Sequence, residues 1–318
     1  MPRTQIAVVI ATHERETRLR FALEAIAAQT LDRDCFELIV VRAPQARGPF
    51  ATAPEGLEVS FTAAPGAGPA AQRNHGWRAA CAPLVAFTDD DCRPQPGWLE
   101  ALLACSGPGA IVQGRTRPDP DERHLLGGLA RSMDVEGPSE WFPSCNIAYP
   151  RRLLERVGGF DESFRSPWGE DTDLGLRASA AGAELRYAPE ALVEHAVLSR
   201  SPLAAAADAR RRRWLALVIA RHPEQRRALY RRVFANRAHA AVAAGIAMAI
   251  GSRSRPALAA LAPVPFVAHN LAFNLGRGIG TPSGVARFAA QMPARLAIDL
   301  IEIAAALEGS VRHRSLVI

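Results

Sequence analysis

The stretch PLVAFTDDDC, residues 83–92, decides the fold class. Residues 83–88 form an apolar run typical of a strand buried on both faces, and the carboxylates of Asp89, Asp90 and Asp91 follow at once. Adjacent carboxylates repel, and each raises the pKa of its neighbours. Such a run therefore needs either open solvent or a cation. Acidic turns are common, so this stretch alone leaves both interpretations open.

Strands and helices alternate on the N-terminal side of this stretch. Apolar runs predict buried strands at 5–11 and 36–41, and alternation predicts a third strand at 57–63. Helical spacing predicts helices over 15–29 and 69–82. This alternation predicts an α/β fold with a mostly parallel sheet. Ligands of such sheets bind beyond the carboxyl ends of the strands, where the three carboxylates lie. Three carboxylates there suit a hard divalent cation.

A second acidic segment lies at 158–182. It contains Asp161, Glu162, Glu170, Asp171 and Asp173. A helix is expected to begin near Glu170, and acidic residues in its first turn would interact favourably with the helix dipole. The dipole does not explain why the stiff, aromatic SPWG (166–169) precedes a carboxylate pair. Strand-like pieces over 183–197 then end near His195, for which a structural role and a ligand role both stay open.

The charge is distributed unevenly along the chain. Every basic residue is arginine, and the net charge is +6. From residue 201 onward there are 17 arginines and five acidic residues, a balance of +12, whereas residues 1–200 carry −6. Basic regions of this kind contact nucleic acid, anionic lipid or only water. The aromatic residues expected of a single-strand nucleic-acid groove are not interleaved with these arginines, so nucleic acid is not an expected partner.

The five cysteines and the N-terminus bear on the cellular compartment. No CxxC pair occurs among Cys35, Cys81, Cys92, Cys105 and Cys145, so reduced, mostly buried thiols are expected rather than zinc ligands or disulfides. The apolar run before Thr12 is too short for the core of a signal peptide. We therefore expect a cytosolic N-terminal end.

The last third of the chain is basic and helical in pattern. Residues 207–237 predict a basic amphipathic helix, a type that lies on anionic membrane surfaces, or else a solvated helix packed on the rest of the protein. Residues 238–251 and 256–273 are apolar but short or interrupted, which favours a shallow hairpin or helices packed at the interface over a spanning helix. Residues 284–309 are again amphipathic.

Four segments carry a resemblance to a known family. They are VVIATHERETRLRFALEAIAAQT (8–30), AAQRNHGWRAACAPLVAFTDDDCRPQPGWLEAL (70–102), CNIAYPRRLLERVGGFDESF (145–164) and WGEDTDLGLRASAAGAELRYAPEALVEH (168–195). In this order they resemble the family 2 glycosyltransferases of GT-A fold, across residues 5–197. The resemblance implies a Rossmann-like GT-A catalytic domain at 1–200, followed by a helical, membrane-associated region at 201–318.

The resemblance also implies roles for single residues. Asp91 and His195 would hold Mg²⁺ or Mn²⁺, and Asp171 would be the general base. The other residues expected at the nucleotide-sugar or next to it are Thr12, Arg15, Arg42, Arg73, Asp89, Asp90, Asn146, Trp168 and Glu170. Arg42 departs from the family, which has an aspartate at this place that recognises the nucleoside. Because arginine cannot accept a hydrogen bond, the donor base stays open.

These expectations combine into one functional hypothesis. The protein would be a metal-dependent, inverting glycosyltransferase that moves one sugar from a nucleotide-sugar to a lipid-linked or cell-envelope glycan acceptor. It would act at the cytoplasmic face of the bacterial inner membrane, as a peripheral or monotopic protein. One alternative is a degenerate GT-A protein that binds without turnover. Another is a processive polysaccharide synthase, whose [QR]xxRW motif matches RRRRW (210–214).

Overall fold

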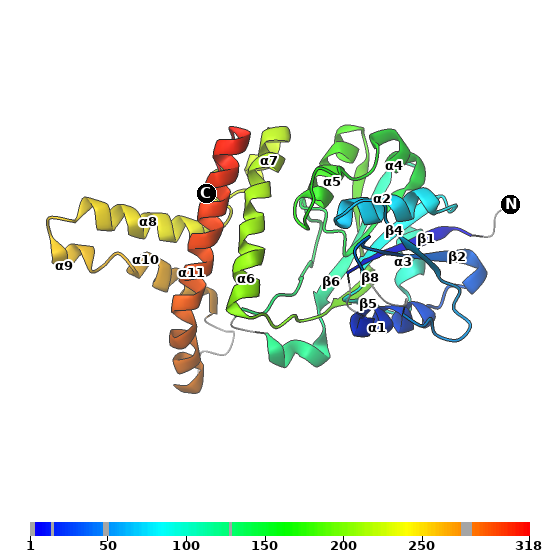
Figure 1. Cartoon of the computed structure of the whole chain (residues 1–318), viewed down its shortest axis with the longest axis horizontal. Helices are drawn as coiled ribbons and strands as arrows, with labels where there is room; N and C mark the ends of the chain where they lie inside the picture. Colours follow the sequence, from blue (N-terminus) through cyan, green and yellow to red (C-terminus); the bar gives the residue numbers. More distant parts are fainter. Residues whose placement is uncertain (1–3, 14–15, 47–50, 127–128, 275–281) are drawn as a thin grey trace. The chain divides into compact units, whose positions relative to one another are not determined.

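The computed structural model describes residues 4–13, 16–46, 51–126, 129–274 and 282–318 (Figure 1). The chain divides into two compact units. The N-terminal unit comprises residues up to 126 together with 130–199, and the C-terminal unit comprises 127–129 and 200–318.

The N-terminal unit is an α/β structure. Its strands, in the described residues, form one sheet in the order β3-β2-β1-β4-β7-β6-β8-β5. The strands are β1 (Ile6–Thr12), β2 (Phe36–Arg42), β3 (Ser60–Ala63), β4 (Leu84–Asp89), β5 (Cys92–Pro94), β6 (Ala110–Pro118), β7 (Asn146–Pro150) and β8 (Glu184–His195). The helices are α1 (Glu16–Ala27), α2 (Pro69–Ala79), α3 (Trp98–Cys105), α4 (Arg151–Val157) and α5 (Glu170–Ala180), with short 3₁₀ turns at Arg33–Cys35 and Pro120–Leu125.

The sheet is mixed rather than mostly parallel. Strands β3, β2, β1 and β4 run parallel as neighbours, and β6 runs parallel to β8. Strand β7 is antiparallel to β4 and β6, and β5 is antiparallel to β8. The prediction of a mostly parallel sheet is therefore right for β3, β2, β1 and β4 and for the pair β6 and β8, and wrong for β7 and β5. An apolar run reports the burial of a strand, not its direction.

Both faces of the central strands are covered by helices. Because side chains alternate along a strand, Val8 faces the cluster that contains Leu23 of α1 and Leu99 of α3, whereas Val9 faces α2. Gly76 lets α2 approach closely, since a Cβ built there would lie 2.4 Å from Val9 Cγ1. These layers bury β1 along its whole length.

The sheet register brings the functional segments to one edge. Thr12 is opposite Arg42, and Ala11 is opposite Asp89, so β1, β2 and β4 end together. Strand β5 follows Asp91 and pairs with β8 so that Cys92 is opposite His195. Residues far apart in the sequence thus meet just beyond the carboxyl end of β4.

The C-terminal unit is helical. Its elements are α6 (Pro202–Ala209), α7 (Arg213–Arg221), α8 (Arg237–Gly251), α9 (Pro256–Ala259), α10 (Val264–Asn274) and α11 (Pro282–His313), with 3₁₀ turns at Arg210–Arg212 and Pro223–Ala228. The prediction of one helix over 207–237 is wrong, because α7 ends just before Pro223, which cannot continue a helix. Leu215, Val218 and Ile219 of α7 are buried, and α7 packs along α11. The apolar face of this basic helix is therefore covered within its own unit.

Helices α8 and α10 form a hairpin whose turn contains α9 (Figure 1). Gly245 permits close packing, since a Cβ there would lie 2.4 Å from the Ala262 carbonyl oxygen. The hairpin exposes a run of large apolar side chains: Ile246, Met248, Ile250, Leu258, Leu261, Val264, Val267 and Leu271. Among the described residues, no helix has both the length and the apolar character needed to cross a bilayer.

Candidate functional site

The three carboxylates after β4 lie in three different surroundings. Asp90 is fully buried, and its Oδ2 accepts hydrogen bonds from the Thr12 hydroxyl at 2.7 Å and from the His13 backbone N–H at 3.3 Å. Asp90 thereby joins the ends of β1 and β4. Asp89 Oδ1 accepts a hydrogen bond from Arg73 Nη2 at 2.8 Å. Asp91 faces a histidine instead.

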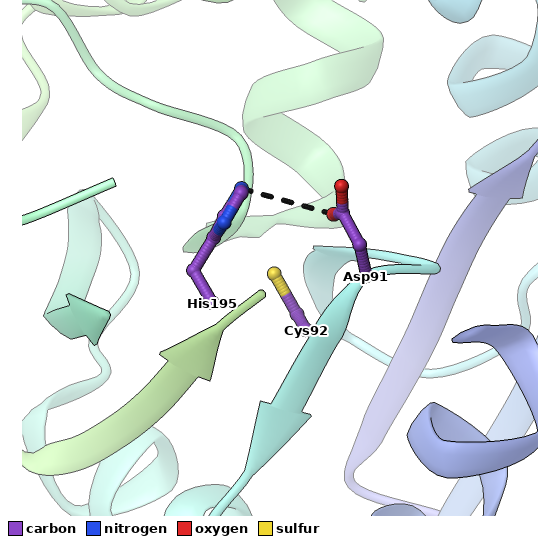
Figure 2. A group of neighbouring side chains, drawn as sticks. All are labelled: Asp91, Cys92 and His195. Atoms are coloured by element: carbon purple, nitrogen blue, oxygen red, sulfur yellow. Dashed lines mark ion pairs between the residues drawn. The ribbon is translucent and has the colours of Figure 1, made fainter. Parts of the chain in front are cut away.

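Asp91 and His195 form a nearly buried pair (Figure 2). His195 Nε2 lies 3.7 Å from Asp91 Oδ1, and His195 Nδ1 lies 2.8 Å from the Ala196 carbonyl oxygen. A carbonyl oxygen only accepts hydrogen bonds, so Nδ1 carries a proton. In the neutral imidazole, Nε2 therefore directs its lone pair toward the Asp91 carboxylate. A second contact closes the group, since the Ala196 N–H donates to the Asp91 carbonyl oxygen at 2.9 Å.

The Asp91 carboxylate and the His195 imidazole are suited as ligands of a divalent cation. The separation of 3.7 Å is too long for a hydrogen bond, and both facing atoms are electron-rich. Two such acceptors, held close together in a buried setting, are stabilised when a positive charge lies between them. A carboxylate with an imidazole suits Mn²⁺, and a carboxylate alone suits Mg²⁺. Metal-ligating histidines are also usually oriented by a hydrogen bond from the other ring nitrogen to a carbonyl oxygen, as His195 Nδ1 makes to Ala196.

Cys92 belongs to the same group but is a poor ligand for such an ion. Its Sγ and the nearest ligand atoms of Asp91 and His195 lie within 4.8 Å of one another (Figure 2). Burial, with a further contribution from the contact with Cys145, raises the pKa of the Cys92 thiol well above its usual value. Because the thiolate is the form that binds metals, the neutral thiol of Cys92 is not expected to be a metal ligand. Of the five free cysteines, only Cys92 and Cys145 are buried, so the prediction of mostly buried thiols is wrong.

The start of α5 holds the second acidic segment, and Arg73 links it to the first. Arg73 is nearly buried, and while Nη2 binds Asp89, Nη1 donates to Glu170 Oε1 at 3.0 Å. The other Glu170 oxygen, Oε2, accepts from the Trp168 backbone N–H at 2.7 Å. Trp168 and Gly169 both have positive φ, 143° and 93°, which sharpens the turn into the helix. One guanidinium thus brings the two acidic segments into a single site.

Asp171 is the carboxyl group of this site that suits proton transfer. Burial and then the neighbouring charge of Glu170 raise the pKa of Asp171 to about 7, although Arg73 and the backbone N–H groups of Thr172 and Ser144 act in the opposite direction. The Thr172 N–H donates to Asp171 Oδ1 at 2.8 Å. A carboxyl group with a pKa near the working pH is well matched to a general base.

The ends of β1 and β2 are joined by a residue that sequence reasoning missed. Gln72 Nε2 donates to the Thr12 and Val41 carbonyl oxygens, at 2.7 and 2.9 Å. Its only sequence signal is its place directly before Arg73. Arg42 is half-buried at the end of β2, and Arg15 lies outside the described residues.

Asn146 does not have the place expected of a sugar-binding residue. Its Nδ2 donates to the Arg115 and Ala191 carbonyl oxygens, both at 2.8 Å, and its Oδ1 accepts from Trp98 Nε1 at 2.8 Å. Both amide protons are thus used inside the protein. The side chain is 1% exposed. The structure gives Asn146 a role in joining the strands and α3, and its geometry does not support the expected ligand contact.

A hollow lies beside α5. It has a volume of about 340 Å³ and is lined by residues 134–141. Thr172 Oγ1 donates to the Trp141 carbonyl oxygen at 2.8 Å, which ties the end of this segment to the residue after Asp171. The segment has no periodic pattern, so only the tertiary structure reveals its place.

A similar set of side chains occurs in the C-terminal unit. His239 Nε2 lies 3.1 Å from Glu302 Oε2 and 3.9 Å from Asp299 Oδ1. Arg212 donates to the same Glu302 oxygen from Nε and Nη2, at 3.0 and 2.8 Å. The guanidinium already supplies the positive charge, so these residues form an ion-pair network rather than a metal site.

Comparisons with known proteins place the chain in a family. The model of glycosyl transferase family 2 matches residues 7–158, and that of glycosyl transferase family group 2 matches residues 120–275. The pre-mycofactocin glycosyltransferase of Mycobacterium tuberculosis is 40% identical over 144 residues, covering 40% of this chain and 30% of that protein. The validoxylamine A glucosyltransferase of Streptomyces hygroscopicus is 27% identical over 226 residues, covering 58% of this chain and 50% of that protein. The matches thus span half or less of the length of these curated relatives.

A solved structure supports the fold. The mannosyltransferase PcManGT from Pyrobaculum calidifontis, in complex with GDP-Man and Mn²⁺, superposes with a TM-score of 0.54 at 19% identity, covering 96% of this chain and 86% of that one. Sequence motifs, family models and architecture agree, and the chain belongs to the family 2 glycosyltransferases of GT-A fold.

Proposed function

We propose that the protein is an inverting, divalent-cation-dependent glycosyltransferase that moves one sugar from a nucleotide-sugar donor to a lipid-linked or glycan acceptor. The observation that carries the proposal is the bridge made by Arg73. Through Asp89 and Glu170 it holds a carboxylate–imidazole pair suited to a cation and a carboxyl group suited to proton transfer in one site.

The two halves of the site match the two needs of glycosyl transfer. Asp171 would take the proton from the acceptor hydroxyl as its oxygen bonds to the anomeric carbon and the bond from that carbon to the diphosphate breaks. A divalent cation held by Asp91 and His195 would neutralise charge on the departing diphosphate. The bound Mn²⁺ of the mannosyltransferase PcManGT supports this use of a cation in the same fold.

Arg42 and the hollow beside α5 bear on the donor and on the acceptor. Arg42 at the end of β2 suits a phosphate oxygen better than a nucleoside hydroxyl. The hollow lined by residues 134–141 is next to α5 and is our candidate for the acceptor side. The relatives' named substrates, pre-mycofactocin and validoxylamine A, are the first alternatives to a lipid-linked or envelope glycan.

We also propose that the C-terminal unit binds the cytoplasmic face of an anionic inner membrane. The amphipathic segment expected to do so is not suitable, since the apolar face of α7 is covered. The exposed apolar side chains of the α8–α10 hairpin are better candidates, and the exposed Arg253 and Arg255 near its turn suit anionic headgroups. Flotation with phosphatidylglycerol-containing vesicles tests this. The double variant Ile250→Ser/Leu258→Ser should lose binding, and the control Leu203→Ser, on exposed α6, should keep it.

The donor experiment is thermal stabilisation by UDP, GDP, dTDP and CDP, each with and without Mn²⁺. We expect one nucleotide to raise Tm only with Mn²⁺, and Asp91→Asn to abolish the shift. Asp32→Asn, exposed before β2 at the opposite edge of the sheet, is the matched control and should keep it. No shift with any nucleotide would contradict the donor class and favour a degenerate protein.

A transfer assay with the donor so identified distinguishes the remaining alternatives. Asp171→Asn should lower the rate of transfer by about 10³-fold, because general-base catalysis of this kind contributes 10²–10⁴-fold. Transfer at the wild-type rate would overturn the role of Asp171. Products longer by several sugars would favour a processive synthase over single transfer.

A further inference from the structure

The Arg73 guanidinium does not contact all the carboxylates of the site equally. Arg73 makes one hydrogen bond to Asp89 and one to Glu170, so its guanidinium is divided between these two partners. Although burial alone would lower the pKa of Arg73, the charges of Asp89 and Glu170 raise it, and the guanidinium stays protonated. Asp171 receives its hydrogen bonds from backbone amides instead.

One positive charge among three carboxylates leaves a local excess of negative charge. Burial makes that excess costly, and protonation of one carboxyl group relieves it. The proton is expected where the guanidinium contact is absent, because a carboxylate bonded to arginine is held in its charged form. Burial and the charge of Glu170 accordingly raise the pKa of Asp171 to about 7.

Besides the Thr172 N–H, four groups face Asp171. Glu170 precedes it on α5, and Arg73 reaches it from α2. Tyr149 of β7 is nearly buried, and burial together with the Asp171 charge raises the pKa of its phenol, which stays neutral. The Ser144 N–H comes from the segment before β7. Of these, Glu170 is the acidic neighbour, whose charge raises the pKa of Asp171, and Arg73 is the basic neighbour, whose charge lowers it.

We infer that Arg73 and Glu170 are positioning residues that set the protonation of Asp171: the guanidinium is bonded to Asp89 and Glu170 rather than to Asp171, and the carboxylate of Glu170 beside Asp171 favours a proton on Asp171. Glu170 also fixes the turn before the helix, since its Oε2 binds the N–H of Trp168, whose φ is 143°. This inference deepens the proposed function and rests on Asp171 as its base.

The test follows the side-chain carboxyl carbon of Asp171 by NMR in the full chain labelled with ¹³C-aspartate, between pH 4 and 9. Asp171→Asn identifies the resonance. Glu170→Gln keeps an oxygen that can accept the hydrogen bond from Arg73 and removes the negative charge. It should therefore lower the pH at the midpoint of the Asp171 titration by about one unit or more. Arg73→Gln removes the opposing charge and should raise it.

Glu162→Gln is the matched control. Glu162 accepts hydrogen bonds from Asn74 and Arg78 of the same helix α2, but it lies outside the Arg73 network, so the midpoint should stay unchanged. Arg73→Gln removes the guanidinium shared by Asp89 and Glu170 and is the variant at risk of misfolding, whereas Glu170→Gln keeps the shape of the side chain and one acceptor oxygen. An Asp171 midpoint that stays within about 0.3 pH units of wild type in folded Glu170→Gln would overturn the inference.

The pH–rate profile of transfer separates the inference from the proposed function. If Asp171 is the base, the acid limb of the profile should shift in Glu170→Gln by the same amount as the NMR midpoint. A shifted midpoint with an unshifted acid limb would support the inference and overturn the role of Asp171 as base. An acid limb that shifts while the midpoint does not would overturn the inference.

Discussion

The Asp91–His195 pair of the N-terminal unit and the His239–Asp299–Glu302 group of the C-terminal unit use the same side-chain chemistry in different surroundings. His195 directs Nε2 at a carboxylate, and its other nitrogen is bound to the Ala196 carbonyl. In the second group, Arg212 occupies the same Glu302 oxygen as the histidine.

A histidine beside carboxylates does not by itself define a cation site. A histidine with carboxylates attracts a metal ion only where no neighbouring arginine already neutralises it. We propose a ligand role for the first group, whereas the second ties η3 (Arg210–Arg212), α8 and α11 together. Breaking each group should have a different consequence, one on cation binding and the other on stability.

The largest stability effect should come from Glu302→Ala. Removing this carboxylate leaves Arg212 and the buried His239 without their shared partner. We expect a loss of about 2 kcal/mol, less than for a fully buried pair, because Arg212 and Glu302 keep some exposure. Calorimetry should show a Tm lower by about 4–8 °C. An unchanged Tm would mean that the network contributes no net stability.

Substitution of each histidine sharpens the comparison. His195→Gln should weaken Mn²⁺ binding by about 10–100-fold, since it removes a ligand, with little change in Tm without metal. His239→Gln should leave Mn²⁺ affinity unchanged and lower Tm instead. Titration calorimetry with Mn²⁺ and thermal melts of the metal-free proteins measure both. Equal losses of Mn²⁺ affinity in the two variants would contradict the distinction.

The smallest effect should be a pH dependence of the second group. Burial, opposed in part by His239, raises the pKa of Asp299 to about 6 from its usual 3.8. The folded state then binds this proton more tightly than the unfolded state, so the contribution of Asp299 to stability falls as pH rises from about 4 to about 6 and is constant above.

Asp299→Asn isolates this contribution. The Tm of the variant minus that of wild type should increase between pH 4 and 6 by about 2–4 °C and then stay level. A difference that is constant or decreases over this range would show that Asp299 is not buried in the folded state as described.

The parts of the site that lie on apolar strands could be predicted from the sequence. The apolar runs 5–11, 36–41 and 83–88 form the buried strands β1, β2 and β4, whose ends meet at one edge, because parallel strands with covered faces read as continuous apolar segments. The helix start at Glu170 was predicted from its acidic first turn, and the structure brings it to the same site.

What could not be predicted depends on contacts between distant segments. The direction of β7 leaves no trace in its composition. The hydrogen bond from Arg73 to Glu170 follows from packing alone. The same is true of the two hydrogen bonds that the Asn146 amide donates to backbone carbonyl oxygens. Pro223, in contrast, is a visible signal against one helix over 207–237, and it outweighs the apolar periodicity on either side of it.

The central claim is that the two acidic segments have different duties, one toward the cation and the other toward the proton. The most direct test measures Mn²⁺ affinity by electron paramagnetic resonance, with the stabilising nucleoside diphosphate present, for Asp91→Asn and Asp171→Asn in parallel. We predict that Asp91→Asn weakens Mn²⁺ binding by more than about 10-fold and that Asp171→Asn leaves it within about 2-fold of wild type. Equal weakening in both variants, or a loss confined to Asp171→Asn, would contradict the account.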